Sequence, residues 1–358
     1  MARARFTIDV DPADLFTERG HQMTTWGIPR AIVERVRARV GEMWSTEPGG
    51  WVPEWEHEAR LAEAHGRWFQ AAMLHGAAKF PCISTDAQAA AYARQLECYA
   101  RAVSVERRVV AVGYRGASTP VPVHVFGSDE PLPLVVLTGG VDTLKIELHK
   151  LAHVLARVGR FRVAAIDMPG TGESEVQLAN DSHVIFEGVI AALRGRAKAG
   201  IWGVSFGGHW AAKLACRETV DAAVDMGGPI GTQLFDGNLP NGMLGIVGNA
   251  LGHAVTRADS DEFSFAAQGL LAARRSAPLL VFNGARDPYV PVDDARAFAG
   301  WDHSTVWIFE DGDHCAANRI KRVIPAALVW LRRQLHGDSA IGHAVARAAE
   351  SLLPHRIA

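Results

Sequence analysis

The residue best placed to do chemistry is Ser205, in the sequence G-V-S-F-G at 203–207. The motif matches G-x-S-x-G, follows the apolar run 199–204 and precedes a helix-forming run at 209–216. A strand that turns sharply into a helix exposes the serine hydroxyl, and small residues must flank the serine because the turn is tight. The pattern predicts that Ser205 is the nucleophile of a serine hydrolase.

A serine nucleophile needs a histidine base, and the base needs an acid to orient it. In hydrolases whose serine lies at such a strand-to-helix turn, called the elbow below, the chain order is serine, acid, histidine. Asp287 follows the apolar run 278–283, and His314 follows the run 304–309. Both would lie beyond carboxyl ends of strands, where open α/β sheets bind ligands. Asp287 is therefore predicted as the acid and His314 as the base.

Other carboxylates compete for the acid position. Asp225, which ends the run 222–226, is the more credible alternative. Asp311 and Asp313 are close to His314 in sequence, and such near neighbours rarely reach behind the imidazole ring.

An oxyanion hole should combine the N–H of Phe206 with one from the loop T-G-G-V-D at 138–142. The glycines of that loop permit a backbone turn that aims an N–H inward. We expect Val141 to be the second donor, with Gly140 next. The alternative is a plain strand-to-helix turn.

Several other residues belong to types that could take part in different chemistry. His149 and His153 are spaced i, i+4 and could share a metal, but no H-E-x-x-H frame surrounds them. His209 and Cys315 are expected to pack. The chain has no Walker A sequence and no G-x-G-x-x-G after a strand. We therefore expect neither a cofactor nor a metal.

The elements that position these residues change in character near residue 105. Compact apolar runs follow that point and alternate with helical patterns, which predicts a mostly parallel sheet with helices on both faces. The first two runs suit a hairpin. The predicted strands are 105–112, 121–126, 134–138, 162–167, 199–204, 222–226, 278–283 and 304–309.

Residues 1–104 are predicted to be a helical module, 105–336 the catalytic domain and 337–358 a terminal helix or tail. A cap insertion is expected at about 229–275. Within the module, apolar faces are expected over 32–44, 61–73 and 91–103. The aromatic residues Trp51, Trp55, Trp68 and Phe69 are expected in its core, with a pocket lining as the alternative.

Composition is that of an ordinary globular protein, with 48% hydrophobic and 21% charged residues and a net charge of −2. Nothing favours nucleic acid or an anionic membrane as partner. No apolar run reaches the roughly 18 to 20 residues of a membrane span. Four cysteines without C-x-x-C spacing suit the cytoplasm. A small-molecule substrate is the expected partner.

Three segments occur in the following order along the chain: D-M-P-G-T-G-E-S at 167–174, the G-x-S-x-G elbow, and D-G-D-H-C at 311–315. Over about residues 105–335 the chain resembles the FrsA-like esterases and the 2,6-dihydroxypseudooxynicotine hydrolase-like subgroup of the α/β-hydrolase superfamily. The resemblance implies a module packed over the active site, a homodimer, and ester or carbon–carbon bond hydrolysis. It also implies Asp236 as an auxiliary acid.

The main hypothesis is hydrolysis of an ester, thioester or β-diketone-like carbon–carbon bond of a small polyketide-like or aromatic metabolite, through an acyl-enzyme. A non-hydrolytic cyclase, epimerase or binding protein on the same α/β-hydrolase fold is the alternative. A protein-interaction role for residues 1–104 is the third hypothesis.

Overall fold

A sheet of eight strands forms the centre of the computed structural model, which describes residues 5–128, 131–231, 239–240, 242–272 and 277–337. The strand order is β1-β2-β4-β3-β5-β6-β7-β8. Strands β3 to β8 pair in parallel, whereas β1 pairs with β2 and β2 with β4 in the antiparallel sense. The strands are β1 (Glu106–Tyr114), β2 (Ala117–Phe126), β3 (Leu134–Thr138), β4 (Arg162–Ile166), β5 (Ala199–Val204), β6 (Ala222–Met226), β7 (Leu279–Gly284) and β8 (Ser304–Phe309).

The parallel strands are apolar because both faces of the sheet are covered. Alternate residues of one strand, such as Val135 and Val136, enter separate cores on opposite faces. Helices α7 (His183–Leu193) and α8 (Phe206–Cys216) cover one face, and α6 (His149–Arg157) and α12 (Ile320–His336) cover the other. The predicted mostly parallel α/β-hydrolase architecture is confirmed.

The hairpin β1–β2 is longer than predicted. It closes through a two-residue turn formed by Arg115 and Gly116. Their φ angles, 48° and 78°, are positive, as required by the turn type that matches the right-handed twist of paired strands. Its outer edge is solvent-facing, and Val109 there is 68% exposed.

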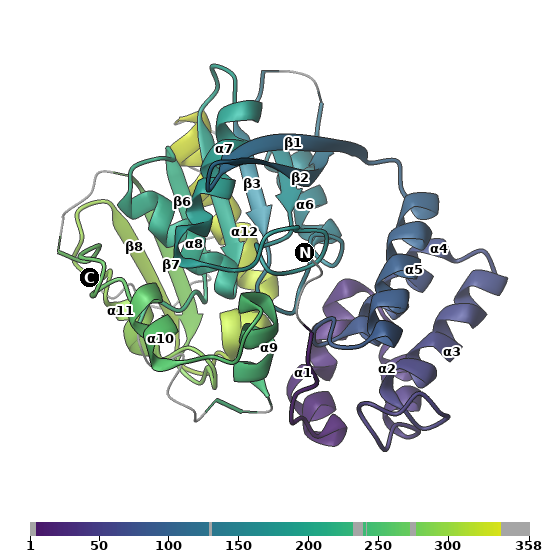
Figure 1. Ribbon diagram of the computed structural model, residues 1–358. Helices are drawn as coiled ribbons and strands as arrows, with labels where there is room; N and C mark the ends of the chain where they lie inside the picture. The colour runs from purple at the N-terminus through teal and green to yellow at the C-terminus, as the bar shows by residue number, and fades with distance from the viewer. Residues whose placement is uncertain (1–4, 129–130, 232–238, 241, 273–276, 338–358) are drawn as a thin grey trace.

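Five helices precede the sheet and share a core of their own. They lie to one side of the sheet, with α1 near the cap helix α9 (Figure 1). In that core Trp51 and Trp55 are fully buried, with ring centroids 4.7 and 6.0 Å from that of Phe16. The helices are α1 (Pro12–Trp26), α2 (Arg30–Arg37), α3 (Trp51–Ala64), α4 (Trp68–Lys79) and α5 (Asp86–Ala102).

For two of the apolar helix faces, the length predicted from periodicity is wrong. The face over 61–73 spans two helices, because the chain turns at Gly66 with a φ of 67°. Leu61 is 44% exposed as a result. The face over 32–44 ends early, since α2 stops at Arg37.

Helices α9 (Met243–Leu251) and α10 (Arg257–Phe263) lie within the expected cap insertion. Residues 5–10, called the strap below, run against α9. The backbone N–H of Phe6 donates to Asn249 Oδ1 (3.1 Å), and Asn249 Nδ2 donates to Phe6 O (2.9 Å). Trp44 Nε1 donates to Ile8 O (3.0 Å). The strap thus joins the cap to the helical module.

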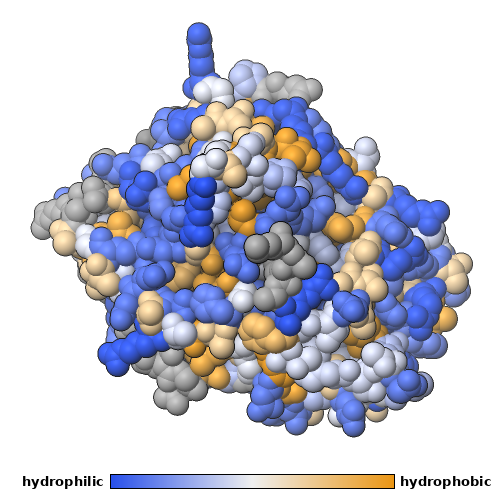
Figure 2. Space-filling view, viewed as in Figure 1, coloured by the Kyte–Doolittle hydropathy of each residue, from blue (hydrophilic) through white to orange (hydrophobic). Residues whose placement is uncertain are grey.

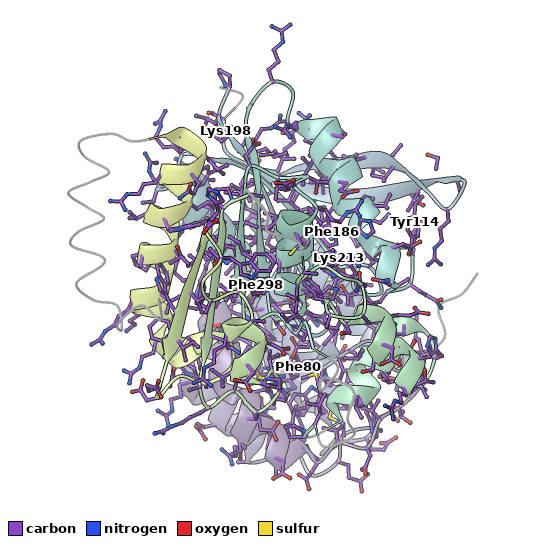
Figure 3. All side chains as sticks on the ribbon, turned by 90° about the vertical axis from the view of Figure 1, so that its left-hand side faces the viewer. Phe80, Tyr114, Phe186, Lys198, Lys213 and Phe298 are labelled. Atoms are coloured by element: carbon purple, nitrogen blue, oxygen red, sulfur yellow. The ribbon has the colours of Figure 1, made fainter. Side chains whose placement is uncertain are left out.

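The helical module faces the carboxyl edge of the sheet. In Figure 3, Lys198, which precedes β5, marks the opposite edge, and Phe80, a core residue of the module, lies at the other end of the molecule. Three short helices complete the described elements: η1 (Asn180–Ser182), α11 (Val292–Arg296) and η3 (His314–Arg319).

The face seen in Figure 2 is mostly hydrophilic, with dispersed apolar spots. Within the described residues, none of the helices combines the length and apolar character needed to cross a membrane.

Candidate active site

Ser205 sits between β5 and α8 with φ 56° and ψ −129°, a backbone conformation that a non-glycine residue rarely adopts. The turn is held by close backbone packing. A Cβ at Gly203 would lie 1.9 Å from Gly207 O, and one at Gly207 would lie 2.6 Å from Gly139 O. The two motif glycines are therefore required by space, and the elbow presents the serine hydroxyl at the carboxyl edge of the sheet.

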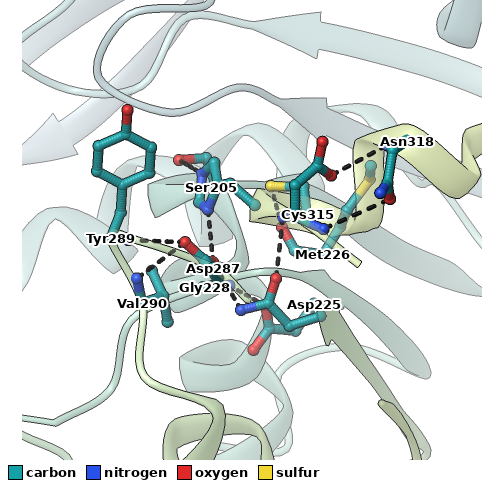
Figure 4. A network of polar contacts seen from close by, with 12 residues as sticks. Ser205, Asp225, Met226, Gly228, Asp287, Tyr289, Val290, Cys315 and Asn318 are labelled. Atoms are coloured by element: carbon teal, nitrogen blue, oxygen red, sulfur yellow. Dashed lines mark hydrogen bonds and ion pairs between the residues drawn. The ribbon is translucent and has the colours of Figure 1, made fainter. Parts of the chain in front are cut away.

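A chain of hydrogen bonds links the three residues expected to form the catalytic triad, of which Ser205 and Asp287 are labelled in Figure 4. Ser205 Oγ lies 2.9 Å from His314 Nε2, and His314 Nδ1 lies 2.7 Å from Asp287 Oδ2. With the Nδ1–H facing the carboxylate, Nε2 is left to accept the serine proton.

The Asp287 carboxylate is fixed by further donors. Asn283 Nδ2 donates to Oδ2 (2.7 Å), and the N–H groups of Tyr289 and Val290 donate to Oδ1 (2.8 and 3.1 Å). Its side chain has no exposed surface. Such a carboxylate orients the imidazole and leaves it little freedom to rotate.

The Asp287–His314 pair stabilises the charged form of each partner. Burial opposes the charge on Asp287, but the His314 charge and the hydrogen bonds outweigh it and lower the pKa of the carboxyl. Burial likewise disfavours imidazolium, yet the Asp287 carboxylate raises the pKa of His314 well above its ordinary value. Such a pair can hold a positive charge on the imidazole.

The rival carboxylates make other contacts. Asp225 Oδ1 accepts from the Gly228 N–H (2.7 Å), and burial raises the pKa of Asp225 to about 8. Asp311 accepts from Arg319 Nε (3.1 Å), and Asp313 Oδ1 accepts from the Asn318 N–H (3.0 Å). Among the described carboxylates, Asp287 is the one that reaches His314.

The glycine-containing loop after β3 (residues 138–142, called the oxyanion loop below) lies directly over Ser205. A Cβ at Gly140 would lie 2.8 Å from Ser205 Oγ and 3.1 Å from Phe206 N. Phe206 is the first residue of α8, where helical N–H groups have no partner within the helix. Because Gly140 has no Cβ, no side chain at this position covers Ser205 Oγ or the Phe206 N–H, and Val141 is the next residue of the loop.

Polar and charged side chains of the helical module hold this loop. Arg19 Nη2 lies 3.4 Å from Asp142 Oδ2, and both side chains are less than a tenth exposed. Gln22 Nε2 donates to Thr143 Oγ1 (2.7 Å), and Lys79 Nζ donates to Asp142 O (3.1 Å). Sequence reasoning missed these residues, because each contact joins segments far apart in the chain.

The loop is also held from the sheet. Lys145 Nζ lies 2.5 Å from Asp167 Oδ2 and 2.6 Å from Glu173 Oε2. The Lys145 side chain is fully buried, and its backbone N–H donates to Asp167 Oδ1 (2.8 Å). The D-x-P-G-x-G-x-S segment therefore acts as scaffold for the residues that follow the oxyanion loop.

Arg19 connects that loop to the loop of the acid. Its guanidinium carbon lies 4.2 Å above the centroid of the Tyr289 ring, and this ring meets His314 edge-on at 5.3 Å. The Tyr289 hydroxyl donates to Glu18 Oε2 (2.7 Å). Helix α1 thus contacts both loops that flank the serine.

Other residues singled out in the sequence have hydrogen-bond or ring-stacking partners outside the Ser205–His314–Asp287 chain. His209 Nδ1 donates to Pro229 O (2.8 Å), and burial lowers the pKa of His209 to about 3. Cys315 Sγ donates to Met226 O (3.1 Å). The rings of His149 and His153 stack at 5.8 Å. Asp236 and the segment 338–358 lie outside the described residues.

Among the described residues, one group of side chains has its potential metal-ligating atoms close together. Glu63, His75 and Cys98 come together inside the helical module. Glu63 already accepts from His75 (2.7 Å) and pairs with Arg94, so its carboxylate has protein partners.

The fold and this site define an α/β-hydrolase. Residues 42–306, well over half of the chain, match the family described as esterase FrsA-like. The chain belongs to the FrsA-like esterase family.

The chain is similar to known proteins in sequence and in fold. Esterase FrsA of Escherichia coli O1:K1 is 26% identical over 283 residues, which cover 69% of this chain and 68% of that protein. Esterase FrsA of Escherichia fergusonii matches to the same extent. The solved structure of wild-type AbyA5 is similar with a TM-score of 0.74, 20% identity and coverage of 90% and 94% of the two chains. The 2,6-dihydroxy-pseudo-oxynicotine hydrolase gives a TM-score of 0.68, 22% identity and coverage of 88% and 95%.

Proposed function

We propose that this protein is a serine hydrolase that cleaves its substrate through an acyl-enzyme on Ser205. The observation that carries the proposal is the hydrogen-bonded chain from Ser205 through His314 to Asp287, set on a strained elbow. Nucleophile, base and orienting acid are within the distances that proton transfer requires.

In the proposed mechanism His314 Nε2 takes the proton of Ser205 as Oγ attacks a carbonyl carbon. The carbonyl oxygen becomes negative and is bound by the N–H groups of Phe206 and Val141, for which Gly140 leaves room. His314 then gives the proton to the leaving group. A water molecule activated by His314 releases the acid, while Asp287 holds the imidazole throughout.

We propose an ester or thioester of a small metabolite as the substrate, and family membership supports the ester. Cleavage of a β-diketone-like carbon–carbon bond uses the same acyl-enzyme but needs a proton for the carbon leaving group. His314 could supply that proton, with Asp236 as the proposed auxiliary acid.

We also propose a cytoplasmic homodimer. Support for the reducing compartment comes from the cysteines, since Cys82, Cys98, Cys216 and Cys315 are all free thiols. The dimer rests on family resemblance and is tested by light scattering after size-exclusion chromatography.

The test uses the full chain and two measurements. We expect Ser205→Ala to lower hydrolysis of p-nitrophenyl hexanoate by at least about 10³-fold and to abolish labelling by a fluorophosphonate. Ser174→Ala, a change of the same size in a scaffold loop, is the control and should keep both. Turnover by Ser205→Ala at the wild-type rate would overturn the proposal, and an unlabelled Ser205 in the wild type would favour the non-hydrolytic alternative.

A further inference from the structure

Three helices of the helical module bring potential metal ligands to one point. Glu63 lies on α3, His75 on α4 and Cys98 on α5, and these helices pack side by side (Figure 1). One ligand atom from each residue lies within 4.8 Å of the other two. The three residues, called the α3–α5 cluster below, are separated along the chain, so it is the packing of the module that assembles them.

The contacts within the α3–α5 cluster converge on one oxygen atom. Glu63 Oε1 lies 2.7 Å from His75 Nε2 and 3.5 Å from Cys98 Sγ. The other oxygen, Oε2, accepts from the Arg94 guanidinium. Arg94 thus orients the carboxylate and leaves Oε1 facing the nitrogen and the sulfur, in the way that outer residues orient the ligands of metal sites.

The ligand set selects the kind of metal. Thiolate, imidazole and carboxylate are the side chains that bind zinc, whereas calcium and magnesium take oxygen ligands. Tetrahedral zinc, with bonds of about 2.0 Å to nitrogen and oxygen and about 2.3 Å to sulfur, holds its ligand atoms roughly 3.3 to 3.5 Å apart. The oxygen–sulfur distance in the cluster, 3.5 Å, already has this value. The oxygen–nitrogen distance of 2.7 Å must widen by about 0.6 Å, which small side-chain rotations supply.

The cluster is buried but borders the surface on one side. Cys98 has no exposed area and His75 is 2% exposed, whereas the Glu63 side chain is 16% exposed. A metal ion can therefore enter past Glu63, and a water molecule can reach the fourth coordination position from the same side. Burial of the other two ligands keeps competing water away from them.

We propose that the α3–α5 cluster is a zinc site, with Glu63, His75 and Cys98 as ligands and water in the fourth position. Burial raises the pKa of the Cys98 thiol to about 11, but a metal that coordinates a thiol deprotonates it. The thiol proton is thus released to solvent as the bond between sulfur and zinc forms. The proposal is independent of the proposed hydrolase function, because Ser205 and its partners take no part in this site.

The proposed zinc site joins helices that also hold the oxyanion loop. His75 lies one turn before Lys79 on α4, and Lys79 Nζ donates to a backbone oxygen of that loop (3.1 Å). Cys98 lies three residues after Gln95 on α5, and Gln95 Nε2 donates to Glu147 Oε1 (2.6 Å), just beyond the loop. Zinc would therefore stabilise the module from which these contacts are made, and its role is structural.

The test measures metal binding by the full chain after a chelator has removed bound metals. We expect the chain to bind about one zinc ion with a Kd below about 1 μM at neutral pH. Zinc in excess should raise the Tm, because it binds the folded chain in preference to the unfolded one. Cobalt(II) in place of zinc should give a thiolate-to-cobalt charge-transfer band in the near ultraviolet, which reports directly on the sulfur ligand.

Two substitutions locate the site. Cys98→Ser should abolish the near-ultraviolet cobalt band, and both Cys98→Ser and Glu63→Gln should weaken zinc binding at least about 100-fold. Cys82→Ser is the matched control, because Cys82 is a thiol of the same module whose sulfur contacts Ser84 Oγ (3.1 Å). This variant should keep both the cobalt band and the wild-type affinity for zinc.

Two results would overturn the zinc site. The first is a wild-type chain that gives no thiolate-to-cobalt band, and this measurement does not depend on the folding of any variant. The second is zinc binding by Cys98→Ser and Glu63→Gln within twofold of the wild-type affinity, which would place the ion elsewhere, for example on the stacked pair His149 and His153.

Discussion

Removal of the Arg19 side chain should damage catalysis although Arg19 touches no reacting atom. Arg19 lies 3.4 Å from the Asp142 carboxylate and 4.2 Å above the Tyr289 ring, so it joins the oxyanion loop to the loop that carries Asp287. Arg19→Ala leaves a buried carboxylate without its cation on one side and an aromatic ring without its guanidinium on the other.

The magnitude follows from these contacts. At an effective dielectric constant of 20, two unit charges 3.4 Å apart attract by about 5 kcal/mol, and breaking one side of a buried pair destabilises proteins by about 3 to 5 kcal/mol. The cation–π contact adds about 1 kcal/mol. The loop can escape this penalty by moving Asp142 toward water, which would displace the neighbouring Val141 N–H. Loss of one oxyanion donor lowers kcat about 10²- to 10³-fold.

The assay is steady-state ester hydrolysis, measured well below the unfolding midpoint of every variant. We expect Arg19→Ala to lower kcat about 100-fold with little change in KM. Arg35→Ala is the matched control: Arg35 pairs with Glu58 inside the same module, and Glu58 keeps Arg39 as a partner at 3.0 Å. That control should keep activity within about twofold.

A second substitution separates positioning from general damage. Adding Asp142→Asn to Arg19→Ala removes the uncompensated buried charge. Movement of the loop toward water then no longer lowers the free energy, so part of kcat should return. If Arg19→Ala is destabilised but keeps the wild-type kcat, Arg19 serves stability alone and the reasoning about the loop is wrong.

Three further outcomes are expected. Gly140→Ala would place a Cβ 2.8 Å from Ser205 Oγ, and kcat/KM should fall at least about 100-fold; fluorophosphonate labelling at the wild-type rate would contradict this. In the proposed mechanism neutral His314 is the active form, so kcat/KM should rise with pH through a pKa above 6.5. Asp287→Asn removes the carboxylate that raises this pKa most, so the limb should move to lower pH and the rate should fall about 10³- to 10⁴-fold. Asn249→Ala removes three hydrogen bonds worth about 1 kcal/mol each, so hydrogen exchange of the strap should accelerate, and unchanged protection there would refute the account of the strap.

Local sequence signals predicted the sheet well. The bounds expected for β3, β5, β6 and β8 agree with the structure, because each strand is a short apolar run buried on both faces with turn residues at its ends. The elbow was equally readable, since strand, serine and helix are contiguous. The Asp287 and His314 side chains come together because both follow neighbouring parallel strands, a relation that topology rules supply.

The helical module was less readable because its packing is not local. Periodicity joined Leu61 to Met73 across the turn at Gly66, since a helical pattern does not show where a chain reverses. Arg19 was not predicted, because an arginine within a helical pattern is usually expected to face solvent. Only the fold brings Asp142 close to it. Pairings of this kind depend on tertiary contacts and leave no spacing signal in a single sequence.

The strap has a consequence for synthesis of the chain on the ribosome. Phe6 emerges 243 residues before its partner Asn249. At roughly 5 to 20 residues per second, about 12 to 50 s separate the two during translation. The helical module can fold around its own core in that interval, yet the contact that fastens it to α9 must wait. Because His314 is made later still, a nascent chain holds a folded module before it holds a competent hydrolase.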